Sequence, residues 1–387
     1  MSLKPDTLLI NQLVALRRSL HRHPELSGKE IQTPSRIKKF LKDYRPDEIR
    51  EKVGGNGLLV IYDSAEPGPD ILFRCDMDAL PIEEVNDFNH RSENEGISHK
   101  CGHDGHMAIM AGVAACLSRH RIKKGRVALL FQPEEETGRG AEKVLHDPFF
   151  ETFKPEMVFA LHNLPGFEEK AVVLKKGPFA SASRGMIIKL QGTSSHAAHP
   201  EQGKSPVRVV TGLLDGLPNI PELKESFDDF CMVTIIHARI GERAFGTSPG
   251  DAVVMATLRS YLDDDMDKLT AMAEYLVDHL CKKYDIEYNI QYTEVFPATV
   301  NKPGALDLVE KAAKDHGAKI VWIDEPFPWS EDFGHVTAKF PGAFFGIGAG
   351  KDQPYLHNNN YDFNDNIIET GVNIFMNIIR QKNQLNV

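Results

Sequence analysis

The sequence lacks a hydrophobic run long enough to span a bilayer. Its longest apolar stretch, residues 108–117, covers only 10 residues and contains a glycine, whereas a transmembrane helix needs about 20. The amino terminus carries no apolar core before its first polar residues, so we expect no secretory signal. The overall composition, with 41% hydrophobic and 26% charged residues, is typical of a globular protein that works in water.

The sequence also lacks an excess of positive charge. It has 45 Lys and Arg residues against 55 Asp and Glu residues, a formal net charge of -10. Binding to nucleic acid or to an anionic membrane surface relies on clustered basic side chains. We find no such cluster, and we therefore expect neither kind of partner.

Cysteine is scarce and shows no pairing pattern. The five cysteines are an odd number, and no two of them form a CxxC pair. A disulfide framework would favour an even number at regular spacings, so we expect a reduced protein in the cytoplasm.

The first and last parts of the chain alternate between short apolar runs and helical patterns. This alternation predicts an α/β fold with a mostly parallel sheet covered by helices on both faces, which makes three layers. The expected strands are 58–62, 71–73, 127–131, 157–161, 319–323 and 342–347. The expected helices are 6–20, 103–119, 303–316, 330–339 and one that starts at 367.

The middle of the chain follows a different order. Strand, helix, strand, strand, helix and strand follow one another in the ranges 186–190, 205–217, 232–240, 252–260, 263–283 and 286–295. The order βαββαβ is that of a ferredoxin-like α+β domain. We therefore expect a discontinuous domain of residues 1–181 and 297–387, interrupted by an inserted domain of residues 182–296.

Side chains that bind metals follow several of the expected strands. In an open parallel sheet the carboxyl ends of the strands form the ligand crevice, so these side chains should converge there. They are Asp76 and Asp78 after 71–73, Glu134, Glu135 and Glu136 after 127–131, His162 after 157–161, and His357 beyond 342–347. Cys101 and His103 precede the helix 103–119 and add a thiolate and an imidazole. A mixed set of Cys, His and Glu ligands suits zinc or another late divalent ion, and manganese is an alternative.

Each of these residues also has a simpler interpretation. A single histidine after a strand is usually a surface residue, and a lone cysteine is usually a small buried apolar residue. Cys101 and His103 could instead belong to the catalytic site of a hydrolase with a cysteine nucleophile, but the glutamates and the other histidines would then have no role. Three adjacent carboxylates at the end of a buried strand repel one another unless a cation compensates them. A metal site is the interpretation that gives all of these residues a role.

The sequence resembles the amidohydrolases of metallopeptidase family twenty, and within it the branch of hippurate hydrolase, N-acyl-amino-acid amidohydrolases and plant indole-acetyl-amino-acid hydrolases. The resemblance covers nearly the whole chain and rests on motifs that occur in the family's order. These are residues 20–27 (LHRHPELS), 76–81 (DMDALP), 101–106 (CGHDGH), 131–136 (FQPEEE), 162–163 (HN), 196–200 (HAAHP), 330–333 (SEDF) and 357–358 (HN).

The resemblance implies a pair of divalent metal ions, zinc or manganese, with cobalt or nickel as further options. The implied metal ligands are Cys101, His103, Glu136, His162 and His357. It further implies Glu135 as the general base, and Asp76 and Asp78 as acidic residues that support the catalytic site. In the inserted domain, a lid and dimerisation domain by resemblance, His196 would stabilise the oxyanion and Arg259 would pair with a substrate carboxylate.

By this resemblance, the protein cleaves the amide bond of an N-acyl or aroyl amino acid and forms a homodimer through the lid. Two alternatives remain open: a dipeptidase or aminopeptidase of the same family, and a non-catalytic relative that binds acyl-amino acids. The sequence departs from the family at two places. Glu134 stands where a small residue is usual, and Gly246 stands where an Asn is common.

Overall fold

The structure is a computed structural model that describes residues 5–386. The chain forms two compact units, each of which is described by itself below. The first unit comprises residues 1–179, 299–325 and 332–387, and the second comprises residues 180–298 and 326–331. The sequence placed the boundaries at 181/182 and 296/297 and assigned 326–331 to the larger domain.

The first unit is built on an eight-stranded sheet. In spatial order the strands are β1 (Glu48–Val53), β2 (Gly57–Asp63), β4 (Arg126–Gln132), β3 (Asp70–Asp76), β5 (Met157–Pro165), β16 (Gly342–Gly350), β6 (Val172–Leu174) and β15 (Ile320–Trp322). The central strands β4, β3, β5 and β16 run parallel, while β1, β2 and β6 join in antiparallel fashion. The expected fold class, an α/β fold with a mostly parallel sheet, is confirmed.

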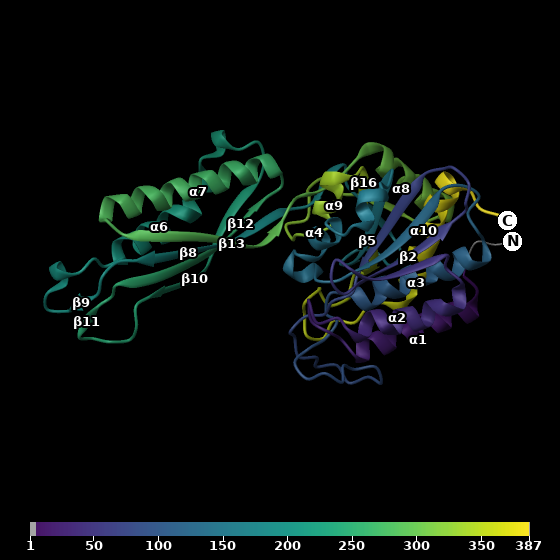
Figure 1. The fold of residues 1–387 in the computed structure, drawn as a ribbon, viewed down its shortest axis with the longest axis horizontal. Coiled ribbons are helices and arrows are strands. Elements are labelled where there is room, and N and C mark those ends of the chain that lie inside the picture. Colours follow the sequence, from purple (N-terminus) through teal and green to yellow (C-terminus); the bar gives the residue numbers. More distant parts are fainter. Residues whose placement is uncertain (1–4, 387) are drawn as a thin grey trace. The chain divides into compact units, whose positions relative to one another are not determined.

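Helices cover both faces of this sheet. The helices of the first unit are α1 (Thr7–Arg22), α2 (Gln32–Leu41), α3 (His103–Arg119), α4 (Gly140–Leu145), α5 (Phe149–Thr152), α8 (Pro303–His316), α9 (Gly334–Lys339) and α10 (Ile368–Asn383). The main core joins α1, α2, α3, α8 and α10 to one face of the sheet, and Figure 1 shows α1, α2 and α3 lying together along it. Helix α4 contacts β4 and α9, and α9 contacts β16.

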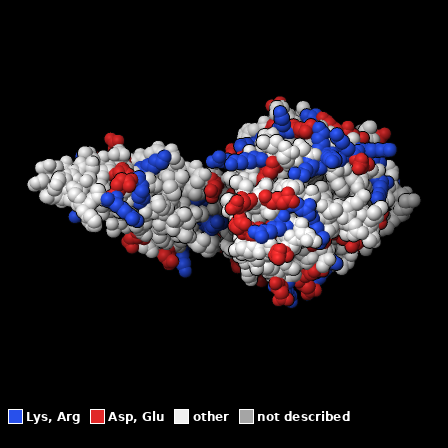
Figure 2. Space-filling view, turned by 90° about the horizontal axis from the view of Figure 1, so that it is seen from below, with Lys and Arg blue, Asp and Glu red and all other residues white. Residues whose placement is uncertain are grey.

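Alternation along the strands assigns side chains to the two faces. In β3, Ile71, Phe73 and Cys75 belong to the main core, so Arg74 and Asp76 point to the opposite face. Helix α3 is buried on nearly every side, which agrees with its unbroken run of small and apolar residues. On the face of this unit that Figure 2 draws, basic and acidic side chains are interspersed.

The second unit contains a four-stranded antiparallel sheet in the order β10 (Cys231–Ile240), β12 (Asp251–Ser260), β8 (Ala182–Gln191), β13 (Glu287–Phe296). Helices α6 (Val207–Asn219) and α7 (Asp263–Tyr284) connect its strands, which gives the βαββαβ order expected from the sequence. A two-stranded ribbon, β9 (Ser195–His196) with β11 (Thr247–Ser248), extends from it. Residues 327–330 belong here because Ser181 N donates to Phe327 O and Trp329 O.

Some local details differ from the expectations. Helix α9 begins at Gly334 rather than near Ser330, without a side-chain cap. Helix α6 runs one residue past Pro218, since a proline in a last turn removes only one hydrogen bond. The remaining elements are the strands β7 (Gly177–Ala180) and β14 (Thr299–Asn301) and six short 3-10 segments. No helix within residues 5–386 is long and apolar enough to cross a membrane.

Candidate metal centre

Four parallel strands bring the candidate ligands to one edge of the sheet. Strands β4, β3, β5 and β16 are parallel neighbours, so their carboxyl ends share that edge. Asp76 ends β3, Glu135 follows β4, and His162 lies in the last part of β5. Cys101 and His103 lie at the start of α3, where Gly102 adopts a φ of 94° that favours glycine.

The five predicted ligands converge as two groups of donor atoms. Cys101 Sγ lies 3.4 Å from His162 Nε2, and His103 completes a group whose donor atoms lie within 4.8 Å of one another. Cys101, Glu136 and His357 form a second such group, in which Glu136 Oε1 lies 3.8 Å from His357 Nε2. Donor atoms bound to one zinc ion at about 2.0–2.3 Å are separated by similar distances.

The imidazoles of the first group present the nitrogen that a metal would need. His103 Nδ1 lies 2.9 Å from Asp78 O, and His162 Nδ1 lies 2.8 Å from Asn163 O. Each Nδ1 therefore donates its hydrogen to a carbonyl, and Nε2 is the nitrogen that each imidazole has left for a metal. His103 Nε2 and Glu136 Oε1 are buried without a hydrogen-bond partner. Buried polar atoms are normally satisfied, so these two fit a bound cation.

The charges around the donors favour a cation. Burial raises the pKa of Glu136 to about 7, with a further contribution from Asp78 and opposition from His103. Burial opposes a charged imidazole at His103, yet the surrounding carboxylates, Asp76 foremost, raise its pKa to about 10. Burial holds the pKa of His162 well below its usual range, which keeps its imidazole neutral and able to bind a metal.

His357 reaches the group from a loop rather than from a strand. Its φ of 65° lies in the left-handed region, which residues other than glycine seldom adopt. Its backbone N–H donates to Lys100 O at 2.8 Å, next to Cys101 in the chain. This bond fixes two ligand-bearing segments to each other although they are far apart in the sequence.

Asp76 uses both of its carboxylate oxygens within the protein, and Asp78 uses Oδ2, while its buried Oδ1 has no hydrogen-bond partner. Asp76 Oδ1 lies 2.7 Å from His106 Nδ1, and its Oδ2 accepts from Arg74 at 2.8 Å. Asp78 Oδ2 accepts from Ser27 Oγ at 2.6 Å and from the backbone of Glu136 at 3.0 Å. Both carboxylates therefore contact groups that hold the candidate ligands in place.

Of the two glutamates that precede Glu136, one faces the donor group and the other faces away. Glu135 is 6% exposed and lies within 4.8 Å of donor atoms of His103 and Glu136. The Glu134 carboxylate instead binds Lys143 Nζ at 2.6 and 2.7 Å and lies against Gly28. The backbone of Glu134 has a φ of 56°, and this left-handed conformation points the side chains of Glu134 and Glu135 in different directions.

The comparisons with known proteins identify the family. Residues 72–381 match the peptidase family M20/M25/M40. The chain belongs to this family. The M20 chain is similar in sequence to the hippurate hydrolase of Campylobacter jejuni, with 31% identity over 95% of this chain and 96% of that protein. It is also similar to the N-acetyl-L-cysteine deacetylase of Bacillus subtilis, with 31% identity over 90% of this chain and 83% of that protein.

A solved structure gives the same result for the fold. The YXEP protein of Bacillus subtilis, described as a dinuclear metal binding peptidase from the M20 family, superposes with a TM-score of 0.82. It is 25% identical and covers 96% of this chain and 98% of its own. The expected family and the expected class of enzyme, a hydrolase of amide bonds, are confirmed. Together with the two donor groups, these relatives support two divalent metal ions in the M20 chain.

The second unit of the M20 chain carries the two predicted substrate residues. His196 is exposed in the β9–β11 ribbon, and its Nδ1 accepts a hydrogen bond from Ala198 N at 3.0 Å. Its proton therefore resides on Nε2, which leaves that atom able to donate. Arg259 Nη1 donates to Pro328 O at 2.9 Å and Ser330 Oγ at 3.0 Å. Within residues 5–386 no Asp or Glu forms an ion pair with Arg259.

Sequence reasoning missed several side chains that support the donors. His106 was left out of the site, yet it spans Asp76 and Asn163, with its Nε2 2.5 Å from Asn163 Oδ1. Its position three residues after His103 on one helix face was the available signal. Asn163 in turn donates to Tyr361 Oη at 2.5 Å. These buried side chains connect the segments that carry His103, His162 and His357.

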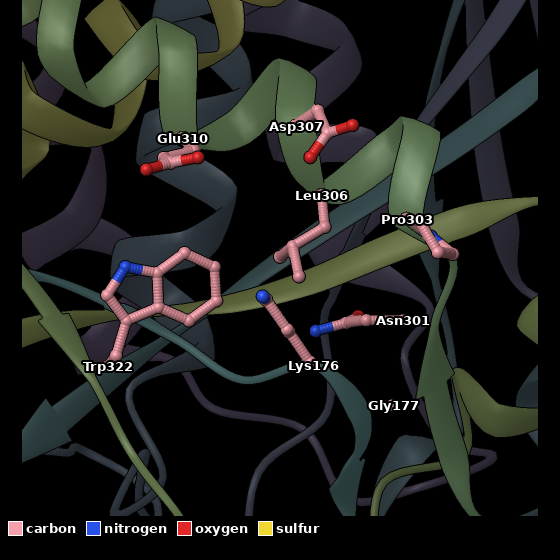
Figure 3. A pocket seen from close by; sticks show the side chains of 8 residues that line it. All are labelled: Lys176, Gly177, Asn301, Pro303, Leu306, Asp307, Glu310 and Trp322. Atoms are coloured by element: carbon pink, nitrogen blue, oxygen red, sulfur yellow. The ribbon is translucent and has the colours of Figure 1, made fainter.

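A separate pocket of about 560 Å³ lies elsewhere in the first unit of the M20 chain. Figure 3 shows Trp322, Lys176 and Leu306 around it, with Asp307 and Glu310 on α8. Trp322 is the last residue of β15, which runs antiparallel to β16. The pocket therefore lies at the opposite ends of the strands from the candidate metal centre, which is at the carboxyl end of β16. It contains none of the predicted site residues.

Proposed function

We propose that the chain is an amidohydrolase that releases an amino acid from its N-acyl or aroyl derivative by attack of a water molecule on the amide carbonyl. The observation that carries this proposal is the adjacent pair of Glu135, which is buried, and Glu136, whose side chain is 13% exposed. Glu136 faces the donor atoms, and the neighbouring Glu135 lies within the same group. A protein that only bound acyl-amino acids would not need a carboxylate that can take a proton.

Cys101, His103, Glu136, His162 and His357 would hold two divalent ions, and zinc or manganese suits this donor set best. Such ions, when bound, polarise the carbonyl and lower the pKa of a coordinated water from 15.7 toward about 7. Cobalt and nickel suit the same imidazole and thiolate ligands and belong in the metal screen.

Glu135 is proposed as the general base. It would take the proton of the attacking water and deliver it to the departing amine, a role typically worth about 10²- to 10⁴-fold in rate. Asp78 is proposed to support this step, because it orients the imidazole of His103 and accepts from the backbone of Glu136.

Two residues of the second unit are proposed to recognise the substrate. His196 would donate its Nε2 hydrogen to the developing oxyanion, in line with the tautomer that Ala198 imposes. Arg259 would bind the free carboxylate of the amino acid. The described hydrogen bonds of its guanidinium go only to neutral acceptors, Pro328 O and Ser330 Oγ, so its charge is available for a carboxylate. An arginine binds a carboxylate through two parallel hydrogen bonds, which a lysine does not reproduce.

The test is a matched pair of variants at neighbouring positions. Glu135→Gln should keep the fold and the metal content but lose about 10²- to 10⁴-fold in kcat on N-acyl amino acids. Glu134→Gln removes an equal charge one residue away and breaks only the contact with Lys143, so kcat should stay near wild type. Normal turnover by Glu135→Gln would refute the proposed base.

A substrate panel separates the proposed activity from its nearest alternatives. N-acetyl and N-benzoyl amino acids should be cleaved faster than dipeptides with a free amino group. Faster cleavage of the dipeptides would make the chain a dipeptidase or aminopeptidase instead. Binding without turnover of any compound, with both metal ions present, would make it a binding protein.

We also propose a homodimer that forms through the second unit. Strand β10 is an edge strand, and exposed apolar side chains continue from it into the β11 ribbon: Ile236 is 61% exposed, and Phe245 is fully exposed. An edge strand of this kind readily pairs with another strand. Sedimentation of the wild type and of Ile236→Lys would test this, because a dimer should dissociate in the variant. The five thiols without disulfides fit the cytoplasm as the proposed location.

A further inference from the structure

Arg74 is a buried cation within strand β3, where its neighbours from Ile71 to Cys75 are apolar. Its side chain is 0% exposed and donates to Asp76 Oδ2 at 2.8 Å, to Asp332 Oδ1 at 2.7 Å and to Gln132 Oε1 at 3.0 Å. The parallel register places Gln132 beside Asp76, so Arg74 and Gln132 are diagonal neighbours on one face of the sheet. A charge without access to water has to be paired, and here two carboxylates pair it.

The two carboxylates bound by Arg74 lead to different halves of the candidate site. Asp76 lies 3.8 Å from His103 Nε2 and binds His106. The backbone N–H of Asp332 instead donates to Glu135 Oε1 at 3.4 Å. Asp332 is itself fixed by Gln132 Nε2, at 2.9 and 2.7 Å from its two oxygens, and by the backbone of Ala141 at 2.8 Å.

We propose that Arg74 is a positioning residue that sets the distance between the base Glu135 and the metal ligand His103. It acts through Asp332 on one side and through Asp76 on the other, and it touches neither substrate nor metal. The part that concerns Glu135 rests on the proposed function. The part that concerns His103 rests on the donor geometry alone.

The shape of the arginine side chain explains why a lysine could not replace it. A guanidinium is planar and directs separate N–H groups to separate acceptors, whereas an ammonium is a single compact donor group. Arg74→Lys therefore keeps the buried charge but cannot reach Asp76, Asp332 and Gln132 together. The loss of a partner that orients ligands typically costs about 10- to 100-fold in metal affinity or activity.

The experiment compares three variants in the full-length protein. Metal affinity is measured by titrating zinc or manganese into the metal-free protein, kcat and KM are measured on an N-acyl amino acid, and thermal unfolding is measured without metal. Arg74→Lys should lower both kcat and metal affinity by about 10- to 100-fold, with KM unchanged. Asp332→Asn should lower kcat by a similar factor and leave metal affinity at the wild-type value.

The matched control is Arg126→Lys. Arg126 binds Asp70 at the other end of the same two strands, β4 and β3, with its Nε 2.9 Å from Asp70 Oδ1. This variant should lower the unfolding temperature without changing kcat or metal affinity. If Arg74→Lys behaves in the same way, Arg74 is a structural ion pair and the proposal is wrong.

The remaining outcomes are also decisive. A metal affinity that falls equally in Asp332→Asn and Arg74→Lys would refute the division into two halves. If Arg74→Lys does not fold, Gln132→Met removes contacts to both Arg74 and Asp332, and unchanged kcat in that variant would refute the link to Glu135. If the wild type cleaves no N-acyl amino acid, the proposed function fails, while the metal titration still decides whether Arg74 positions His103.

Discussion

His21 should make the stability of the first unit depend on pH. Its side chain is 0% exposed, with Nδ1 2.8 Å from Asp104 Oδ2 and Nε2 3.0 Å from Glu84 Oε1. Burial opposes the charged imidazole, but the carboxylate of Asp104 and the hydrogen bond to Glu84 outweigh it and raise the pKa of His21 to about 9. The imidazolium therefore stabilises the native state.

The size and the pH range of this effect follow from the raised pKa. A change from the ordinary value of 6.5 to about 9 corresponds to about 3 kcal/mol in the free energy of unfolding. Because the native pKa is the higher one, this contribution is fully present below about pH 6.5 and is lost as the pH rises through about 9.

The assay is urea unfolding of the wild type and of His21→Gln, both saturated with metal, between about pH 6 and 9.5. The wild type should exceed the variant most at low pH, and the difference should shrink by about 3 kcal/mol toward high pH. His23→Gln is the control: this neighbour is 30% exposed beside Glu93, so its replacement should change stability by less than about 0.5 kcal/mol. A wild-type advantage over His21→Gln that is the same at every pH would show that His21 carries no charge.

Three further predictions concern the metal and two glycines. Chelation should abolish hydrolysis, and titration with zinc or manganese should restore it, with up to two ions per chain by elemental analysis; full activity of the metal-free protein would contradict the site. Gly102→Ala should cost about 1–3 kcal/mol and weaken metal binding, because φ is 94° and a Cβ would lie 2.4 Å from Asn163 Oδ1; unchanged urea unfolding and metal titration would contradict this. Gly246→Asn should leave urea unfolding unchanged, because a Cβ added at this position would have no atom within 4 Å. It should change KM rather than kcat, and an unchanged KM would exclude position 246 from substrate recognition.

The sequence was most informative where one periodic pattern ran over many residues. Helix α3 has the predicted bounds, His103 to Arg119, because small and apolar residues continue without a break through its middle, from Met107 to Leu117. The convergence of Cys101, Glu136 and His162 was also predictable, since parallel strands share one edge at their carboxyl ends. Both inferences rest on local patterns combined with a general rule of sheet topology.

The contacts that orient the ligands were not predictable in the same way. Arg74 and Asp332 are separated by 258 positions in the chain, and no periodicity relates them. The charged residue within the apolar strand 71–75 was a signal that a partner exists, but not of its identity. The three-residue strand β6 was not among the expected strands, whereas β15, of the same length, was expected within 319–323.

The return of residues 326–331 to the second unit has a practical consequence for dissecting the protein. A fragment made only of residues 180–298 would lack the carbonyls of Phe327 and Trp329 that receive the backbone hydrogen of Ser181. It would also leave the guanidinium of Arg259 without Pro328 O and Ser330 Oγ. Anyone isolating this part of the molecule would have to graft the hexapeptide back, for instance by a short linker, before asking what Arg259 recognises.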